Sequence, residues 1–338
     1  MATARDRHYD TCINGGSCIV VAGLVPAMLA RRYMRRRRLP KQITHALTGR
    51  TVRCILFDLG ETLWTLRDDT TLQHLDSAAY ERVLAALHGH TPSLSPVATL
   101  ALYSQIKEAL EEYIHNARRQ RAYYEPDFTL ATSEVLQQVG LSGVTPELSA
   151  AVFEALRVSS SESRVPFPDT FSTLETLRAR GFLLGIVSNR NWGGELFQQD
   201  LQILGFFEYF DPSCIAISAD LGIRKPNPDI FLRVLNALDV APHEAVMVGD
   251  SLRADVAGAK KLGMFTVWKP SRRLRAALAA EMVDDVLQSH LTEEERLLAY
   301  AQHSARVKYG PSQDDMQPHL VIAHLHELLA IFVEPGVQ

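Results

Sequence analysis

The sequence predicts an α/β fold, a Rossmann-like parallel sheet into which an all-helical cap domain is inserted. One observation is that short apolar runs alternate with amphipathic helical segments from residue 166 to residue 269. Strands that alternate with helices are typical of a parallel sheet covered on both faces. The other observation is a stretch in which apolar residues recur only at helical spacing, residues 65–165. Because an apolar strand precedes this stretch, the helices interrupt the sheet after its first strand.

The first strand of the core is expected at residues 52–58, which are mostly apolar and end at Asp58. Such a run is typical of a strand buried on both faces. The helical stretch that follows contains four periodic segments, which predict a four-helix bundle. We therefore assign residues 51–64 and 166–338 to the core and residues 65–165 to the cap.

The remaining strands and helices of the core alternate along the chain. A helix closed by Gly181 precedes the strand FLLGIVSN, and a helix with Pro228 near its start precedes the strand AVMVGDS. Glycine commonly follows the end of a helix, and proline is tolerated in its first turn. Further strands are predicted at CIAIS, at MFTVWK and at the start of HLVIAHLHELLAIF, which continues as a helix.

A second helical insertion is predicted within the core at residues 271–316. This segment is charged and helical, and it lies between two consecutive strand signals. It leaves the end of a strand on the side where open α/β sheets bind their ligands. Two kinds of interpretation stay open: a second lid over that site, or a segment without a role at the site, which is a solvated decoration or an oligomer contact.

Composition places the chain among ordinary globular proteins. It has 338 residues, of which 46% are hydrophobic and 22% charged, with a net charge of -4. Residues 1–50 hold ten Arg or Lys and two Asp, whereas the remainder holds 25 basic and 37 acidic side chains. An acidic body argues against nucleic-acid binding, which needs a basic face. The four cysteines form no CxxC pair, which indicates a reduced, cytoplasmic location.

The basic N-terminal extension, residues 1–50, is not expected to belong to the fold. Its apolar run CIVVAGLVPAMLA is thirteen residues long and contains Pro26, whereas a membrane-spanning helix needs about 20 apolar residues. Its arginines follow the apolar run, whereas a secretory signal places its positive charges before it. Three interpretations stay open: a disordered leader, a short membrane anchor that would make the protein membrane-associated, and a basic targeting or surface-binding segment.

Chemically reactive side chains follow the apolar runs at four places. The carboxyl ends of parallel strands meet at one edge of a sheet, so these side chains are expected around one crevice. The set consists of Asp58, then Ser188 and Asn189, then Lys225, and finally Asp250 and Asp255.

The chemistry of this set favours phosphoryl transfer. Carboxylates at close range repel one another unless a cation lies among them. Oxygen ligands with room for water and phosphate suit Mg²⁺ better than zinc, and the set contains no His or Cys. Asp58 is a possible nucleophile that would form an acyl-phosphate intermediate. Ser188 and Lys225 are suited to bind the phosphoryl oxygens.

The four segments resemble the haloacid dehalogenase (HAD) superfamily of hydrolases, in the branch with a helical cap inserted after the first motif. The resemblance rests on ILFDLGET, PFPDTFSTLETLRARGFLLGIVSN, SADLGIRKPNPDIF and VGDSLRADVAGAKKLG, and it covers nearly the whole chain beyond the N-terminal extension. It implies Asp58 as nucleophile and Mg²⁺ ligand, with Asp250 as a second ligand. It also implies that Ser188 binds the phosphoryl group.

The resemblance further implies supporting roles for three residues. Lys225 would steady the nucleophile and the phosphoryl charge, and Asp255 would support Lys225 or a metal-bound water. Asn189 would face the same crevice and contact the substrate.

Gly60 departs from the pattern of family phosphatases, which usually have a second Asp there as metal ligand and general acid. Gly60 still offers a backbone carbonyl to the metal, but it cannot transfer a proton. General acid–base help is worth about 10² to 10⁴ in rate. Glu61 is a possible substitute, but neighbouring side chains of an extended segment point to opposite faces. A proton-transfer role and a structural role for Glu61 both stay open.

The functional prediction is an Mg²⁺-dependent phosphatase of a small phosphorylated metabolite, working through an aspartyl-phosphate. Without the second Asp, it is expected to prefer acyl, aryl or anomeric phosphates. One alternative is a non-catalytic protein that binds a phosphorylated ligand. Another is a 2-haloacid dehalogenase, although the resemblance would then predict loss of the acidic residues that GDSLRAD retains.

Substrate choice is expected to lie in the cap, which closes over the crevice. Its most basic stretch is NARRQR, residues 116–121. Two interpretations stay open: the arginines bind a second anionic group of the substrate, or they lie in solvent at a helix end where the helix dipole favours them.

Overall fold

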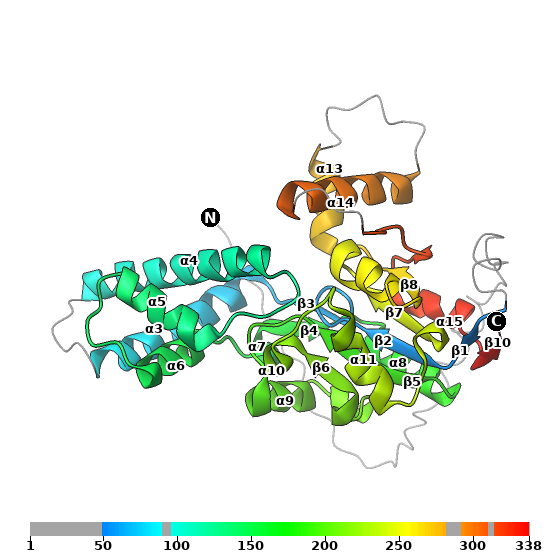
Figure 1. Cartoon of the computed structure of the whole chain (residues 1–338), viewed down its shortest axis with the longest axis horizontal. Coiled ribbons are helices and arrows are strands. Elements are labelled where there is room, and N and C mark those ends of the chain that lie inside the picture. The colour runs from blue at the N-terminus through cyan, green and yellow to red at the C-terminus, as the bar shows by residue number, and fades with distance from the viewer. Residues whose placement is uncertain (1–48, 90–95, 282–291, 310–313, 338) are drawn as a thin grey trace, which may run out of the picture. The chain divides into compact units, whose positions relative to one another are not determined.

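The computed structural model describes residues 49–89, 96–281, 292–309 and 314–337, and it has the α/β fold that the sequence predicts. Its main sheet has six parallel strands in the order β6-β5-β2-β7-β8-β9 (Figure 1). The strands are β2 (Cys54–Phe57), β5 (Leu183–Ser188), β6 (Ile215–Ile217), β7 (Ala245–Gly249), β8 (Phe265–Trp268) and β9 (Leu320–Val321).

The central strands are apolar along their whole length because helices cover both faces of the sheet. Every residue of β2, β7 and β8 is buried. The strand expected at residues 52–58 is shorter than predicted. Arg53 is exposed, and the preceding residues form β1 (Thr51–Val52), which pairs antiparallel with β10 (Gly336–Val337). The buried strand β2 therefore begins only after the charged, solvent-exposed residue Arg53.

Helices of the core follow the predicted segments. The longer ones are α8 (Thr170–Ala179), α9 (Gly194–Ile203) and α11 (Pro228–Ala237). α11 begins with proline, and the side chain of Asn227 caps its first turn. After β7, a π-helical segment, η4 (Leu252–Ala257), runs into α12 (Gly258–Lys260). The shorter helices are α10 (Ser218–Leu221), α15 (Leu328–Ile331), η1 (Phe206–Glu208), η2 (Pro212–Cys214), η3 (Pro242–Glu244) and η6 (Leu325–Glu327).

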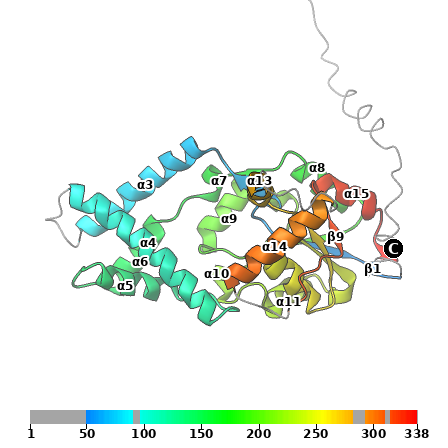
Figure 2. The same cartoon turned by 90° about the horizontal axis from the view of Figure 1, so that it is seen from above.

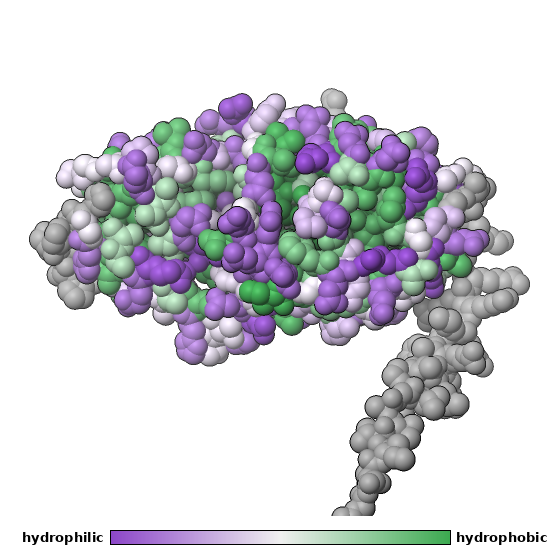
Figure 3. All heavy atoms as spheres, turned by 90° about the horizontal axis from the view of Figure 1, so that it is seen from below, coloured by the Kyte–Doolittle hydropathy of each residue, from purple (hydrophilic) through white to green (hydrophobic). Residues whose placement is uncertain are grey.

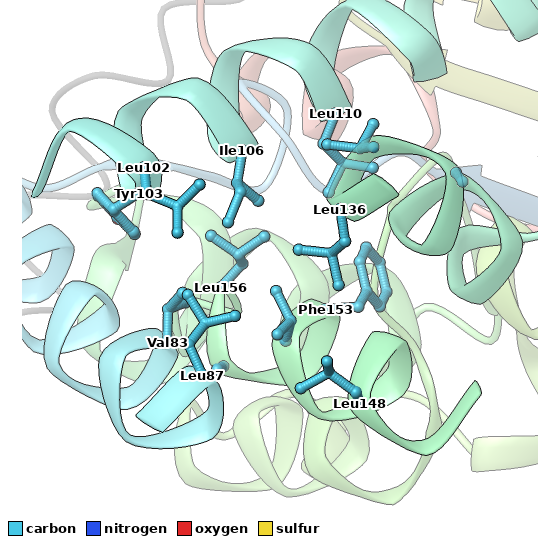
Figure 4. Packing of buried hydrophobic residues seen from close by; sticks show 14 of the residues in the cluster. Val83, Leu87, Leu102, Tyr103, Ile106, Leu110, Leu136, Leu148, Phe153 and Leu156 are labelled. Atoms are coloured by element: carbon cyan, nitrogen blue, oxygen red, sulfur yellow. The ribbon is translucent and has the colours of Figure 1, made fainter. Parts of the chain in front are cut away.

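The predicted helical module contains four long helices. They are α3 (Asp69–His88), α4 (Pro96–Gln120), α5 (Phe128–Gln138) and α6 (Pro146–Ala155), followed by the short α7 (Ser160–Ser163). Their apolar residues point toward one another and form a core separate from that of the sheet (Figure 4). Leu87, Ile106, Leu136 and Phe153 come one from each long helix and are all buried there.

The two connections to this module form a feature that the helical prediction missed. β3 (Trp64–Leu66) pairs antiparallel with β4 (Arg164–Pro166), so the chain enters and leaves the module side by side. Backbone groups of adjacent extended segments satisfy each other by hydrogen bonding. The periodicity of either segment alone is too short to reveal such a pairing.

In its described residues, 271–281, 292–309 and 314–316, the second insertion forms two helices between β8 and β9. They are α13 (Arg272–Glu281) and α14 (Glu293–Tyr309) (Figure 2). Leu278 and Leu297 belong to one buried cluster with Leu252 of η4 and Trp268 of β8. α14 is therefore packed on the core next to η4 by apolar contacts.

The predictions about the N-terminal extension concern residues outside the described part of the chain, apart from Gly49 and Arg50. Among the described residues, no helix combines the length and the apolar character that crossing a bilayer requires. Figure 3 shows one face of the molecule, on which hydrophobic residues gather in separate groups among hydrophilic ones.

Candidate active site

Three neighbouring strands bring the predicted site residues together at one edge of the sheet. Asp58 follows β2, Ser188 ends β5 and Asp250 follows β7. β2 lies between β5 and β7, so the carboxyl ends of all three strands are adjacent. The site therefore forms because β5, β2 and β7 are neighbours in the sheet, although they are not consecutive strands in the sequence.

Lys225 lies at the centre of this site and is fully buried. Its Nζ lies 2.6 Å from Oδ1 of Asp58, 2.6 Å from Oδ1 of Asp255 and 2.6 Å from the carbonyl oxygen of Val187. Burial disfavours the charged ammonium, but the carboxylates of Asp255 and Asp58 outweigh it and raise the pKa of Lys225. The two carboxylates therefore favour the protonated form of Lys225.

Three carboxylates lie close together here, and Lys225 contacts two of them. Asp58, Asp250 and Asp255 each offer an oxygen, and these oxygens all lie within 4.8 Å of one another. Burial, followed by the negative charges of Asp58 and Asp255, raises the pKa of Asp250 well above its usual value. Burial also raises the pKa of Asp255 to about 6, although Lys225 opposes this shift. The cluster thus has an excess of negative charge.

The excess charge fits a hard divalent cation such as Mg²⁺. All the candidate ligands are oxygens, as Mg²⁺ prefers. Within the described part of the chain, Asp250 accepts no hydrogen bond through its carboxylate, whose oxygens are thus available as ligands. A bound cation would also relieve the repulsion that raises the pKa of Asp250.

Gly60 has room for a side chain. A Cβ atom built on Gly60 would lie 3.9 Å from Oδ2 of Asp58, which is an ordinary van der Waals distance. Steric exclusion therefore does not explain the absence of an acidic residue at this position.

Both carboxylate oxygens of Glu61 are engaged in hydrogen bonds. Its Oε1 accepts a hydrogen bond from Oγ1 of Thr65 at 2.7 Å, and its Oε2 accepts one from the backbone N–H of Arg272 at 3.3 Å. The expected extended backbone is wrong here, since Glu61 has a left-handed φ of 55°. The structure favours the structural role: Glu61 joins the start of the cap connection to the start of the second insertion.

Ser188 and Asn189 both lie at the crevice but make different contacts. Oγ of Ser188 donates to Oδ1 of Asp58 at 3.2 Å. The amide of Asn189 is engaged with the backbone of Lys225: its Oδ1 accepts from the N–H at 2.8 Å and its Nδ2 donates to the carbonyl at 3.0 Å. Asn189 thus fixes the loop that carries Lys225.

Sequence reasoning missed two basic residues beside the site. Arg190 is half-buried, with its guanidinium carbon 5.6 Å from the centre of the Trp64 ring and 4.6 Å from that of the Phe197 ring, and desolvation lowers its pKa to about 10. Lys269 donates from Nζ to the carbonyl oxygen of Glu61 at 2.8 Å, and burial lowers its pKa to about 8. Arg190 directly follows the predicted strand FLLGIVSN and Lys269 is the last residue of the predicted strand MFTVWK, and these positions are the signal that would have singled them out.

Comparison with known proteins places this site in a family. A family model for haloacid dehalogenase-like hydrolases matches residues 52–263. A glyceraldehyde 3-phosphate phosphatase from Methanopyrus kandleri is 30% identical over 64% of this chain and 83% of its own. A protein of the same name from Pyrococcus abyssi is 32% identical over 64% of this chain and 81% of its own.

Solved structures include a HAD phosphatase from Thermococcus onnurineus, which is 24% identical to this chain with a TM-score of 0.46. That alignment covers 85% of this chain and 100% of the other. The family match, residues 52–263, includes Asp58, Ser188, Lys225 and Asp250. The chain therefore belongs to the haloacid dehalogenase-like hydrolase family.

Proposed function

We propose that the protein is an Mg²⁺-dependent phosphatase of small phosphorylated metabolites that works through an aspartyl-phosphate on Asp58. The observation that carries this proposal is the environment of the Asp58 carboxylate. Its Oδ1 accepts hydrogen bonds from Lys225 and Ser188. Its Oδ2 accepts none from the described residues, and a carboxylate with one oxygen fixed and the other free is arranged for attack.

The relatives support a phosphatase over other hydrolases. Two relatives that are at least 30% identical over most of their length carry the name glyceraldehyde 3-phosphate phosphatase. A shorter match, 35% identical over 49% of its length, is named phosphoserine phosphatase. These names support a small phosphate ester as substrate.

In the proposed first step, Oδ2 of Asp58 attacks the phosphorus atom. A bond from Oδ2 to phosphorus forms while the bond from phosphorus to the leaving oxygen breaks, and the leaving group departs with the electron pair. Lys225 holds Oδ1 in place and offsets the negative charge that phosphate brings into the site. Ser188 is close enough to Oδ1 to turn its hydroxyl toward a phosphoryl oxygen.

In the second step, a water oxygen forms a bond to the phosphorus of the aspartyl-phosphate while the bond from phosphorus to Oδ2 breaks. The electron pair of the broken bond restores the Asp58 carboxylate, and the protons of the water leave with the orthophosphate. Asp58, Asp250 and the carbonyl oxygen of Gly60 would hold Mg²⁺, which supplies positive charge for the phosphoryl oxygens when bound. We assign Asp255 and Asn189 positioning roles, because they contact Lys225 through its Nζ and its backbone.

Gly60 limits the leaving groups that the proposed enzyme can expel. No carboxylic acid stands at this position to protonate the leaving oxygen, and Glu61 is engaged elsewhere. Acyl, aryl and anomeric phosphates leave without much protonation, so we expect them to react faster than alkyl phosphates.

The test is phosphate release from a panel of metabolite phosphates, with Mg²⁺ or with a chelator, by the wild type and by Asp58→Asn. We expect turnover by the wild type with Mg²⁺ and background rates in the other three conditions. Equal turnover by Asp58→Asn would refute the proposed nucleophile, and full turnover in chelator would refute the metal dependence.

The proposed location is the cytoplasm. Among the described residues, Cys54 and Cys214 are both free and buried, which suits a reducing compartment.

A further inference from the structure

A cavity of about 300 Å³ lies beside the carboxylate cluster, and five separate parts of the chain line it, three of which belong to α4, η4 and α14. α4 of the helical module contributes Arg118 and Arg119, and η4 of the core contributes Arg253. The end of α14 contributes Lys308 and Tyr309. The volume is at the small end of sites that bind small molecules. The second insertion thus helps to form a cavity next to the site.

The wall of this cavity is strongly cationic. Six of its lining residues are Arg or Lys, whereas Glu111 contributes a carboxylate. Burial, followed by the positive charge of Arg118, lowers the pKa of Arg224 in this wall to about 10. Cations that repel one another in a partly enclosed space favour the binding of an anion.

Part of this charge is already neutralised within the protein. Glu125, whose side chain is 1% exposed, pairs with Arg118 at 2.6 Å and lies 3.6 Å from Arg224. Lys225, also in the wall, pairs with Asp58. These carboxylates hold Arg118, Arg224 and Lys225 in place. The remaining cations of the wall are therefore the candidates for binding an anionic ligand.

Arg119, Arg253 and Lys308 have no such compensation. Across the described ranges, no salt bridge joins any of the three to a carboxylate. The guanidinium carbon of Arg253 lies 4.4 Å from the centre of the Tyr309 ring. This contact ties α14 to η4 and leaves the N–H groups of Arg253 to bind an anion.

The cavity and the carboxylate cluster share part of their structure. Asn189 and Lys225 line the cavity, and Nζ of Lys225 lies 2.6 Å from Oδ1 of Asp58. The cavity wall and the carboxylate cluster therefore share Lys225.

We propose that this cavity binds a second anionic group of the substrate, and that α14 is a specificity element because it supplies Lys308 and Tyr309. This inference rests on the proposed phosphatase function. It narrows the substrate class to phosphate esters that carry a second anionic group, either a carboxylate or another phosphate. It also favours the substrate-binding interpretation of the basic stretch at residues 116–121.

The test compares substrates that differ in one group. 3-Phosphoglycerate carries a carboxylate where glyceraldehyde 3-phosphate carries an aldehyde, and ribulose 1,5-bisphosphate carries a phosphate where ribulose 5-phosphate carries a hydroxyl. In at least one pair, we expect the anionic substrate to have the higher kcat/KM. A preference for 3-phosphoglycerate would identify the second group as a carboxylate, and a preference for ribulose 1,5-bisphosphate would identify it as a phosphate. Arg253→Gln and Lys308→Gln should each lower that preference about tenfold. Arg306→Gln, also on α14 but outside the cavity wall, should leave it unchanged.

A binding measurement distinguishes failure of this inference from failure of the proposed function. 3-Phosphoglycerate and ribulose 1,5-bisphosphate are titrated into Asp58→Asn protein, and into the same protein with Arg253→Gln. Binding that weakens with Arg253→Gln, without turnover of any phosphate of the panel by the wild type, would support the cavity and refute the phosphatase. Turnover with no preference for either anionic substrate, or a preference that Arg253→Gln and Lys308→Gln leave intact, would refute the cavity's role alone.

Discussion

Nζ of Lys225 lies 2.6 Å from Oδ1 of Asp58, and both side chains are buried. The same nitrogen contacts Asp255, so one ammonium group holds together two carboxylates from different segments of the core. In the proposed reaction, this contact orients the nucleophile and prevents charge repulsion from disrupting the site. It also makes the site depend on Lys225 for its stability.

Lys225→Gln is expected to destabilise the fold as well as abolish turnover. Removing one partner of a buried ion pair typically costs about 3–5 kcal/mol, because the other charge is left uncompensated. Urea unfolding in chelator measures the loss. The matched control is Lys260→Gln, which breaks an exposed pair with Asp315 and should cost at most about 1 kcal/mol. Equal losses for the two variants would contradict the central position of Lys225.

Asp250→Asn is expected to stabilise the protein in chelator and to weaken its response to Mg²⁺. The raised pKa of Asp250 shows that its negative charge is unfavourable in the fold without a cation. Removing that charge should raise the free energy of unfolding in chelator, whereas the Mg²⁺ concentration needed for stabilisation should increase. Thermal unfolding across an Mg²⁺ series measures both effects. A variant that is less stable in chelator yet responds normally to Mg²⁺ would exclude Asp250 as a ligand.

Gly60→Asp is expected to speed the release of alkyl leaving groups. The site has room for the new Cβ atom, and a general acid contributes up to about 10² to 10⁴ in rate. Acetyl phosphate, whose leaving group needs little protonation, should gain much less. Gly60→Asn is the control, since it adds a side chain of similar size without a transferable proton. If Asn and Asp gave the same gain on alkyl phosphates, proton transfer would not be its cause.

His319 is expected to make the fold sensitive to acid. Its Nδ1 lies 3.1 Å from the backbone N–H nitrogen and 2.8 Å from Oγ1 of Thr266 in β8. Burial, followed by the charges of Lys260 and Arg50, lowers its pKa from 6.5 to about 4. Between these values the unfolded chain binds more protons than the fold, so stability falls as the pH decreases through this window.

Comparing the wild type with His319→Asn isolates this effect, because the amide oxygen of Asn can still accept a hydrogen bond. As the pH falls from 6.5 to about 4, the free energy of unfolding of the wild type should decrease more than that of His319→Asn. Urea unfolding across this range measures it, and a constant difference would show that His319 does not titrate as expected.

Strand ends and family motifs were sufficient to predict the parallel sheet and the gathering of Asp58, Ser188, Lys225 and Asp250 at one edge. Both follow from local apolar runs and from the rule that parallel strands end on one side. The β3–β4 pair was not predictable, because residues 64–66 and 164–166 are far apart in sequence and too short for a periodic signal.

The contacts of Asn189 and Glu61 could not be predicted from the sequence either. Asn189 binds the backbone of Lys225, and Glu61 binds the backbone of Arg272, so each depends on a loop distant in sequence. The cationic cavity has the same origin. Arg119, Arg253 and Lys308 become neighbours only because α4, η4 and α14 approach one another in the fold.

The most direct test of the proposed chemistry is capture of the phosphoryl group on Asp58. Wild-type protein with Mg²⁺ is mixed with acetyl phosphate, quenched in acid within one turnover, digested and analysed by mass spectrometry. We expect a phosphoryl group on the peptide that contains Asp58, and we expect none when the reaction has gone to completion or when Asp58→Asn is used. Phosphate release without any phosphorylated Asp58 peptide at early times would contradict the aspartyl-phosphate mechanism.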